Sequence, residues 1–89
     1  MPNTVARLPE HAVAVTPSDT TRIRCLALFV GVGGNVNVHT LHDVERENRE
    51  GVAPTAVLFK NVASGTVLPV AVGRVLSTST TATDIVACR

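Results

Sequence analysis

Metal coordination is the first chemistry that the residue types of this 89-residue chain could support. The spacing of the potential ligands matches no known cage, because the chain contains neither a C-x-x-C pair nor an H-x-x-x-H pair. His39 and His42 stand at a strand-to-loop boundary, where exposure to solvent is the plainer interpretation. We therefore expect no metal site and no cofactor. The potential ligands are His11, Cys25, His39, His42, Asp43 and Cys88.

The two cysteines could form one disulfide or remain reduced. Cys25 lies within an apolar run and Cys88 lies at the end of another. Two isolated cysteines do not make the dense disulfide framework of a small secreted domain. Reduced cysteine behaves as a small buried hydrophobe. We favour structural thiols, and a single bridge between the two is the alternative.

Catalytic patterns are absent from the sequence. No G-x-S-x-G elbow or similar setting surrounds the many serines and threonines, which are typical of strands and turns here. The acidic residues gather at residues 41–54, where interleaved arginines would keep them ionised. Residues 31–34, Gly-Val-Gly-Gly, superficially resemble a phosphate loop but lack the lysine and the following helix. We expect that the protein is not an enzyme.

Charge and hydropathy argue against nucleic-acid and membrane partners. Eight basic residues nearly balance seven acidic ones, so the chain has no strong field for long-range attraction. No stretch approaches the roughly 18 apolar residues of a membrane span, and the N-terminus has no apolar signal region, which predicts a soluble chain. An OB-like barrel that binds single strands is the remaining alternative, although the chain has no Tyr or Trp for base stacking. Its phosphate contacts would be Arg22, Arg24, Lys60 and Arg74.

Short β-branched runs separated by turn residues predict an all-β fold of about six strands. They favour a small single-domain β-sandwich or β-barrel over residues 12–89, preceded by an extended N-terminal arm at residues 1–11. The arm either is disordered or lies along a neighbouring subunit through Val5 and Leu8. The predicted strands are residues 11–15, 22–32, 35–40, 55–62, 66–76 and 84–88.

Glycine and proline indicate how these strands connect. Gly33 and Gly34 predict a hairpin between the second and third strands. The turn at residues 63–65 predicts a second hairpin between the fourth and fifth. Pro69 cannot donate to a ladder and should lie at a sheet edge, and Gly73 indicates a bulge or a close backbone approach.

Residues 41–54 interrupt the strand pattern and predict an exposed charged loop. Glu45 and Arg49 stand four residues apart and could stabilise one helical turn, which Gly51 and Pro54 would end. This segment either is a solvated loop or contacts a partner. The candidate contact residues are Glu45, Arg46, Glu47 and Arg49.

The core of so small a domain should be thin, which favours a homo-oligomer with cyclic symmetry. Hydrophobic residues make up 45% of the chain, but they are mostly small and include only two aromatics. Valines on the strand faces, together with the arm, are the candidate interface, unless these valines fill the monomer core. The candidate interface residues are Val5, Leu8, Val67, Val70 and Val72.

Two segments carry a resemblance to a known family. They are residues 14–36, AVTPSDTTRIRCLALFVGVGGNV, and residues 61–89, NVASGTVLPVAVGRVLSTSTTATDIVACR. In their Thr-Pro-Ser-Asp turn, their Gly-rich strand end and their "GTVLPV…RVL…TTA.DIVA" ending, they resemble the spike base proteins of bacteriophage-like heads, including gene transfer agents. The chain departs from that pattern at residues 41–54, where a shorter connection is expected, and in the turns at Ala63 and Ser79.

The resemblance implies a non-catalytic virion protein on the outer surface of a head, at its vertices or over the shell. Such a protein acts as a homo-oligomeric spike base or as a cement or decoration subunit. Its partners would be further copies of itself, the major capsid protein and a fibre or spike protein. A small tail or neck component of the same particle is the alternative.

Overall fold

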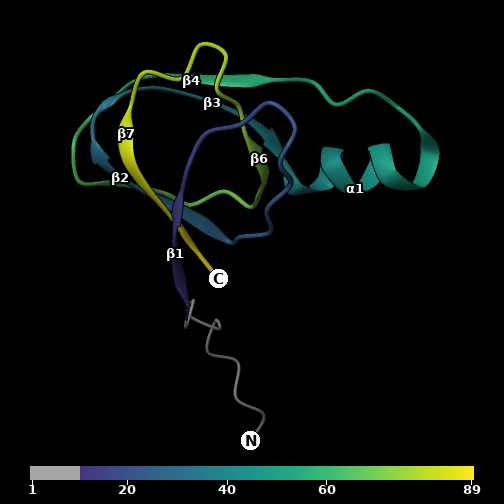
Figure 1. Ribbon diagram of the computed structural model, residues 1–89, viewed down its shortest axis with the longest axis horizontal. Helices are drawn as coiled ribbons and strands as arrows, with labels where there is room; N and C mark the ends of the chain where they lie inside the picture. Colours follow the sequence, from purple (N-terminus) through teal and green to yellow (C-terminus); the bar gives the residue numbers. More distant parts are fainter. Residues whose placement is uncertain (1–10) are drawn as a thin grey trace, which may run out of the picture.

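The computed structural model describes residues 11–89, and Figure 1 shows its ribbon. Over this range the strands form two antiparallel sheets, sheet A in the order β1-β7-β2-β5 and sheet B in the order β4-β3-β6. The predicted small all-β domain is confirmed, in its sandwich form and with one short helix added. The elements are β1 (Ala12–Val15), β2 (Ala27–Val32), β3 (Gly34–Thr40), α1 (Leu41–Glu50), β4 (Val57–Val62), β5 (Thr66–Leu68), β6 (Val72–Val75) and β7 (Thr83–Cys88).

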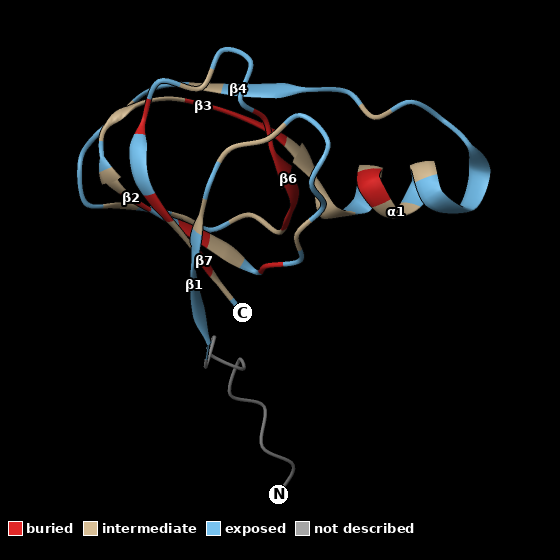
Figure 2. Ribbon diagram, viewed as in Figure 1, coloured by how far each residue is buried: buried red, intermediate tan, exposed pale blue. Residues whose placement is uncertain are grey.

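A narrow aliphatic core fills the space between the sheets. Leu28 and Val30 of β2 are fully buried, while Phe29 between them is 37% exposed, as the alternation of a strand requires. Val36 and Val38 of β3 face them from sheet B. Figure 2 shows the buried residues concentrated on the inner strands. The buried core cluster consists of Cys25, Leu28, Val30, Val36, Val38, Val72, Val75, Ala82, Ile85 and Ala87.

The hairpin predicted at Gly33 and Gly34 is wrong. β2 pairs with β5 and β7, whereas β3 pairs with β4 and β6, so the chain passes from one sheet to the other at Gly33. A Cβ at Gly33 would collide with the carbonyl oxygen of Val62 and approach the amide nitrogen of Ser64 to 2.8 Å. Glycine is required here for close passage of the chain between sheets.

The second predicted hairpin is also wrong. β4 belongs to sheet B and β5 to sheet A, and the two strands do not pair. The predicted strand at residues 66–76 divides at Pro69, so that β5 ends in sheet A and β6 lies in sheet B. Because β5 is the last strand of sheet A, Pro69 does follow an edge strand.

The loop predicted at residues 41–54 begins instead with a ten-residue helix, α1. Gly51 ends the helix with φ at 70°, a left-handed conformation that glycine adopts readily, and its N–H donates to the carbonyl of Glu47. Asp43 in the first turn and Arg49 in the last complement the helix dipole. The predicted exposure is right for residues 51–53, which follow the helix.

Helix α1 lies against sheet B through Val44, its one buried residue. A Cβ at Gly73 of β6 would come within 2.6 Å of Val44 Cγ2. The bulge predicted at Gly73 is confirmed, because the register of β3 with β6 shifts there, from His39 opposite Arg74 to Thr40 opposite Val72. The atoms that approach Gly73 belong to a helix side chain and not to the backbone. At the start of the helix, the Leu41 N–H donates to the carbonyl of Ala71 at 3.0 Å.

The polar loop at residues 77–82 is fixed by side-chain hydrogen bonds. Asn37 of β3 donates through Nδ2 to the Thr78 carbonyl at 3.0 Å, and its own N–H donates to Thr80 Oγ1 at 2.9 Å. From the other side, Asp19 accepts hydrogen bonds from the start of the loop. These contacts join both sheets to the segment that links β1 to β2.

Candidate assembly surfaces

The outer face of sheet A carries a row of exposed apolar side chains. Phe29 of β2 stands directly opposite Val67 of β5 on one side and Val86 of β7 on the other. Val67 is 55% exposed and Phe29 is 37% exposed. We call Phe29, Val67 and Val86 the apolar row.

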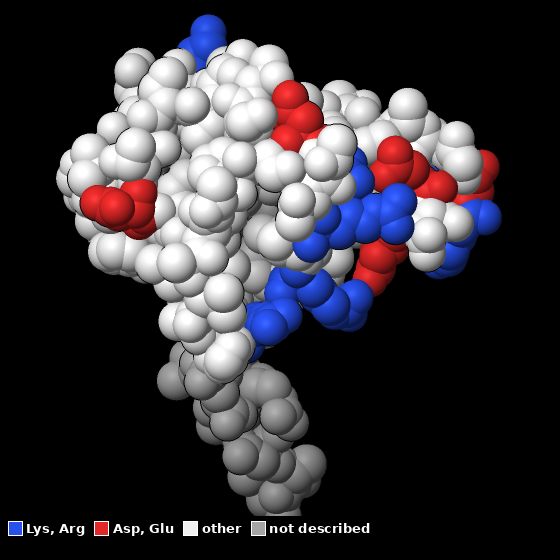
Figure 3. All heavy atoms as spheres, viewed as in Figure 1, with Lys and Arg blue, Asp and Glu red and all other residues white. Residues whose placement is uncertain are grey.

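Most residues around the apolar row are small and uncharged, whereas Asp84 of β7, two residues before Val86, is exposed and acidic. Sheet register places Ala14 of β1 beside Val86, and it places Ala12 and Ala27 beside Cys88 on the same face. Figure 3 shows most Lys, Arg, Asp and Glu side chains gathered around α1 and the chain next to it, while the part of the molecule around β2 and β7 is mostly white, with one acidic group at the left edge. A large exposed apolar surface of this kind is typical of a protein–protein contact.

The structure separates the predicted interface valines. Val67 is exposed in the apolar row, whereas Val70 is partly buried and packs against the core. Val72 is fully buried within the core cluster, so its assignment to an intersubunit surface is wrong. Its side chain faces inward, as the alternative interpretation of these valines expected. Val5 and Leu8 lie outside the described residues.

The predicted partner-contact residues lie on α1 and bind mainly to their own chain. Glu45 pairs with Arg24, and Arg46 pairs with Glu50 at 3.6 Å, one turn along the helix. The predicted pairing of Glu45 with Arg49 is therefore replaced by these two contacts. Glu47 accepts from two arginines, Arg22 and Arg74, each at 3.5 Å. The pairs that Glu45 and Glu47 make hold α1 against sheet B and residues 22–24. Arg49 is exposed.

Arg74 is a buried arginine beneath α1. It is 6% exposed, and its guanidinium contacts Glu47 Oε1 at 3.5 Å and His39 Nδ1 at 3.0 Å. Burial, followed by the adjacent Arg74 charge, holds the pKa of His39 below its usual value. A neutral His39 can accept from Arg74 through Nδ1, so the two groups stabilise each other as a polar pair.

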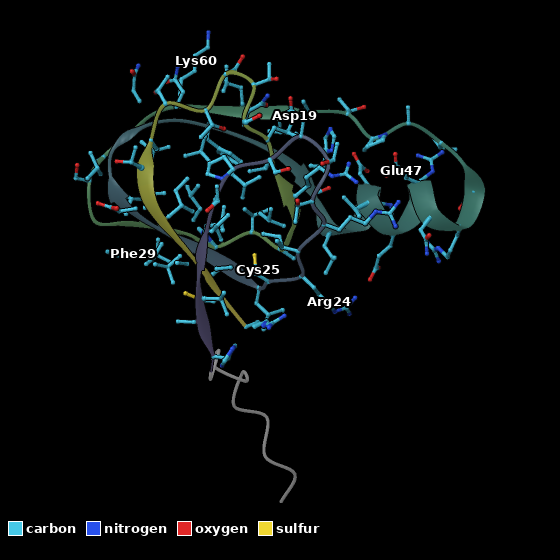
Figure 4. The ribbon with its side chains drawn as sticks, viewed as in Figure 1. Asp19, Arg24, Cys25, Phe29, Glu47 and Lys60 are labelled. Carbon is cyan, nitrogen blue, oxygen red and sulfur yellow. The ribbon has the colours of Figure 1, made fainter. Side chains whose placement is uncertain are left out.

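The four basic residues considered for nucleic-acid binding do not share a surface. Arg74 is buried beneath α1, where its guanidinium already contacts His39 and Glu47. Lys60 and Arg24 project on opposite sides of the molecule in Figure 4. The aromatic side chains do not help, because Phe29 is on sheet A and Phe59 packs against the core. The prediction that these four basic residues form one phosphate-binding site is therefore wrong.

Both cysteines are free thiols. Cys25 is buried and directs its Sγ towards the Val72 carbonyl at 3.6 Å. Burial raises the pKa of the Cys25 thiol, which favours the protonated form. Among the described residues, no three His, Cys, Asp or Glu side chains come together as a metal site. No helix in the described part of the chain is long and apolar enough to cross a membrane.

Phe29 is the surface residue that the sequence reasoning missed. Both faces of its strand are apolar, which predicts a strand buried on both sides. The structure instead leaves Leu26, Phe29 and Val32 substantially exposed. The signal that could have found Phe29 is its alternation with Leu28 and Val30, because only one face of a strand in a two-layer sandwich meets the core. Leu26 and Val32 share the parity of the buried residues, so alternation does not identify them.

Comparison with known proteins finds similar chains among solved structures. No family model matches the sequence, and no curated protein does. Among solved structures, the chain is similar to a chain from the capsid of a native gene transfer agent (GTA) particle, computed with C5 symmetry, at 31% sequence identity and a TM-score of 0.71. The match covers 91% of this chain and 83% of that chain. The protein therefore belongs to the family of this gene transfer agent capsid protein and is a structural protein of the virion.

Proposed function

We propose that the protein is a homo-oligomeric spike base or decoration subunit on the outer surface of a phage-like capsid. In this role it contacts the major capsid protein and either supports a fibre or stabilises the shell. The observation that carries the proposal is the exposed, uncharged apolar row on sheet A, in a chain whose relative is part of a capsid.

The apolar row favours contact with further copies of the chain. Burial of apolar surface is favourable by about 25 cal/mol per Å², so covering the apolar row with another surface would lower the free energy of the protein. The monomer has a narrow core, so burial between subunits would add stability that the isolated domain lacks. An uncharged face also needs no matching charges on its partner.

A ring of three or more copies needs two different contact surfaces on each copy, because each subunit meets one neighbour on each side. The edge strand β4 offers two candidates for this second surface, Val57 and Leu58, with exposed fractions of 39% and 37% and with side chains on opposite faces of the strand. Strand β4 is also the outer strand of sheet B. The relative comes from a capsid computed with C5 symmetry, and a ring of copies at a vertex would fit such an axis.

Light scattering of the purified full chain tests this proposal. The wild type should form a stable oligomer at micromolar concentration, and Val67→Asp should dissociate it by placing a charge in the apolar row. Val52→Asp is the matched control, because Val52 is an exposed valine (38%) outside the strands of sheet A. A monomeric wild type at tens of micromolar would contradict the proposal. If both variants kept the oligomer, the apolar row would be excluded as the interface.

A further inference from the structure

A groove with a cavity of about 400 Å³ lies between β1 and the segment that follows it, residues 16–24. This groove is separate from the apolar row, and it is separate from the contact between Arg74 and α1. Aliphatic side chains form much of its lining, and arginines are its charged members. The lining residues are Val13, Ala14, Val15, Thr16, Ser18, Thr21, Arg22, Ile23, Arg24, Ala87 and Arg89.

The groove is the open side of the sandwich. β1 is the outer strand of sheet A, and the chain then crosses to sheet B, where Ser18 N–H donates to the Val75 carbonyl at 2.8 Å. Ile23 N–H donates to the Gly73 carbonyl at 2.9 Å, so this segment runs along the outer edge of β6. The two walls of the groove therefore belong to different sheets.

The aliphatic lining is an uncovered continuation of the core. Val13 is opposite Ala87, which is opposite Leu28, so the three side chains share the inner face of sheet A. Leu28 and Ala87 are buried, but Val13 remains 40% exposed. Val15 and Ile23 are only partly buried where they meet the core. The described residues leave this end of the core without a cover.

Within residues 11–89, one edge of β1 pairs with no strand and offers main-chain hydrogen bonds beside this lining. His11 and Arg89 exchange both of their backbone hydrogen bonds, N–H to carbonyl in each direction. In an antiparallel pair such residues alternate with residues whose N–H and carbonyl groups point away from the partner strand. Ala12 and Ala14 are therefore the residues of β1 that present these groups to an added strand.

Three guanidinium groups border the groove, and none of its lining residues is acidic. Arg22 and Arg24 are paired with Glu47 and Glu45, yet their side chains remain 50% and 71% exposed. Arg89 adds a third positive charge at the end of the groove. Figure 3 shows basic side chains gathered below and beside α1, with acidic side chains next to them. The charge of the groove thus selects for an acidic occupant.

We propose that this groove binds an extended peptide segment of another protein of the particle, in which acidic and aliphatic side chains alternate. The segment adds a strand to β1, places its aliphatic side chains against Val13 and Ile23, and directs its carboxylates to the arginines. This inference rests on the proposed function, in which the subunit holds a fibre or capsid partner.

Two other occupants fit less well. The first ten residues of a second copy contain one arginine and one glutamate, so they offer no net negative charge. A nucleic-acid strand would match the arginines, but the described lining has no aromatic ring on which a base could stack. Charge and apolar character together favour an acidic segment from a different protein.

Fluorescence anisotropy with synthetic probes tests the proposal on the full chain. The first probe is a fluorescein-labelled peptide in which glutamate alternates with valine. The comparison probes are the same peptide with lysine in place of glutamate, and a labelled oligothymidylate. The variants are Arg89→Glu, which reverses one charge of the groove, and Ala14→Pro, which removes an outward N–H of β1 and leaves the pairing with β7 intact.

Lys60→Glu is the matched control, because it makes the same change of charge on β4, outside the groove. The glutamate peptide should bind and the lysine peptide should not. Arg89→Glu and Ala14→Pro should each weaken binding by about five- to tenfold, whereas Lys60→Glu should change it by less than about twofold. Unchanged far-UV circular dichroism and melting temperatures establish that the variants are folded.

Three results would overturn the proposal: no binding of the glutamate peptide, equal weakening by Lys60→Glu and Arg89→Glu, or tighter binding of the oligothymidylate than of the peptide. Light scattering of the same samples separates this proposal from the preceding one. An oligomer that does not bind the peptide contradicts the groove alone. A monomer that binds it contradicts the oligomeric role and leaves the groove as a peptide site.

Discussion

Asp19 holds Thr78 through both of its carboxylate oxygens. Oδ1 accepts the Thr78 backbone N–H at 3.0 Å, and Oδ2 accepts the Thr78 hydroxyl at 2.6 Å. Asp19 Oδ1 also accepts the N–H of Ser77 at 2.9 Å. One side chain of the Thr-Pro-Ser-Asp turn therefore fixes the loop between β6 and β7, 59 residues further along the chain.

Asp19→Asn should lower the melting temperature at neutral pH. The asparagine amide has one acceptor oxygen, so it cannot replace both carboxylate oxygens as acceptors of these hydrogen bonds. The hydrogen bonds from Thr78 and then Ser77 hold the pKa of Asp19 below its usual value. A lowered pKa means that the ionised form stabilises the fold above the usual pKa and that this contribution is lost as the pH falls through the folded-state pKa. The difference between wild type and variant should therefore narrow below about pH 4.

Thermal melts between about pH 3 and about pH 7, followed by circular dichroism, measure the difference in melting temperature between wild type and variant. Asp84→Asn is the control, since Asp84 is exposed and adopts a positive φ of 54° that asparagine tolerates. Equal melting temperatures for wild type and Asp19→Asn at neutral pH would show that the carboxylate does not fix the loop.

Gly73→Ala should destabilise the protein by about 1–3 kcal/mol, because its methyl group would overlap Val44. Chemical denaturation gives the free energy of unfolding. Val44→Ala alone should also destabilise, by removing the buried side chain of α1. The double variant removes both γ-methyl groups of Val44 from the path of the new methyl group and leaves Cβ of residue 44 at 2.7 Å, so the combined loss should be smaller than the sum of the single losses. Additive losses would contradict direct packing of Val44 on Gly73.

Acidification should weaken the contact of α1 with sheet B through His39. The pKa of His39 is lowered by burial and by Arg74, so the unfolded chain binds its proton more readily than the folded chain. Stability contributed by the neutral imidazole is complete at higher pH and declines as the pH falls below about 6.5. Denaturation midpoints measured between neutral and mildly acidic pH should show this slope.

His39→Gln should flatten the pH dependence of the denaturation midpoint, because the amide does not titrate. His42→Gln is the control, as His42 is the exposed histidine of α1 and should retain the wild-type slope. A slope that survives in His39→Gln and disappears in His42→Gln would contradict the assignment.

The thiols should differ in reactivity under native conditions. Cys88 is partly exposed on sheet A, whereas Cys25 is buried with a raised pKa, so a thiol reagent should modify Cys88 first and reach Cys25 only on unfolding. Mass spectrometry after brief labelling identifies the modified residue. Failure of both thiols to react in denaturant without reductant would show that they form a disulfide.

The sequence predicts most of the strands, because short β-branched runs favour extended structure. The strand predicted at residues 22–32 begins only at Ala27, and before it Cys25 makes a single bridge to Val72. The sequence does not predict the partners of the strands. Gly33 is compatible with a hairpin turn and with passage between sheets, and only the nearby Val62 carbonyl decides between them. Pro69 marks the end of a strand but gives no information on which sheet the next strand joins.

The sequence does not predict the length of α1 or the exposure of Phe29 in the apolar row, for different reasons. The helix has one buried residue, Val44, so its apolar periodicity is too weak to stand out among the charges, although Gly51 marks its end. The exposure of Phe29 was not predicted, because a strand with apolar residues on both faces is expected to be buried on both faces. An oligomeric subunit breaks this rule, since its second face meets a neighbour only after assembly.

Cryo-electron microscopy of intact particles that carry this protein tests the central claim most directly. The account predicts repeated copies of this sandwich on the outside of the head, with the apolar row covered by an adjacent copy. Density for the chain at the neck or tail, or single separated copies on the head with the apolar row facing solvent, would contradict it.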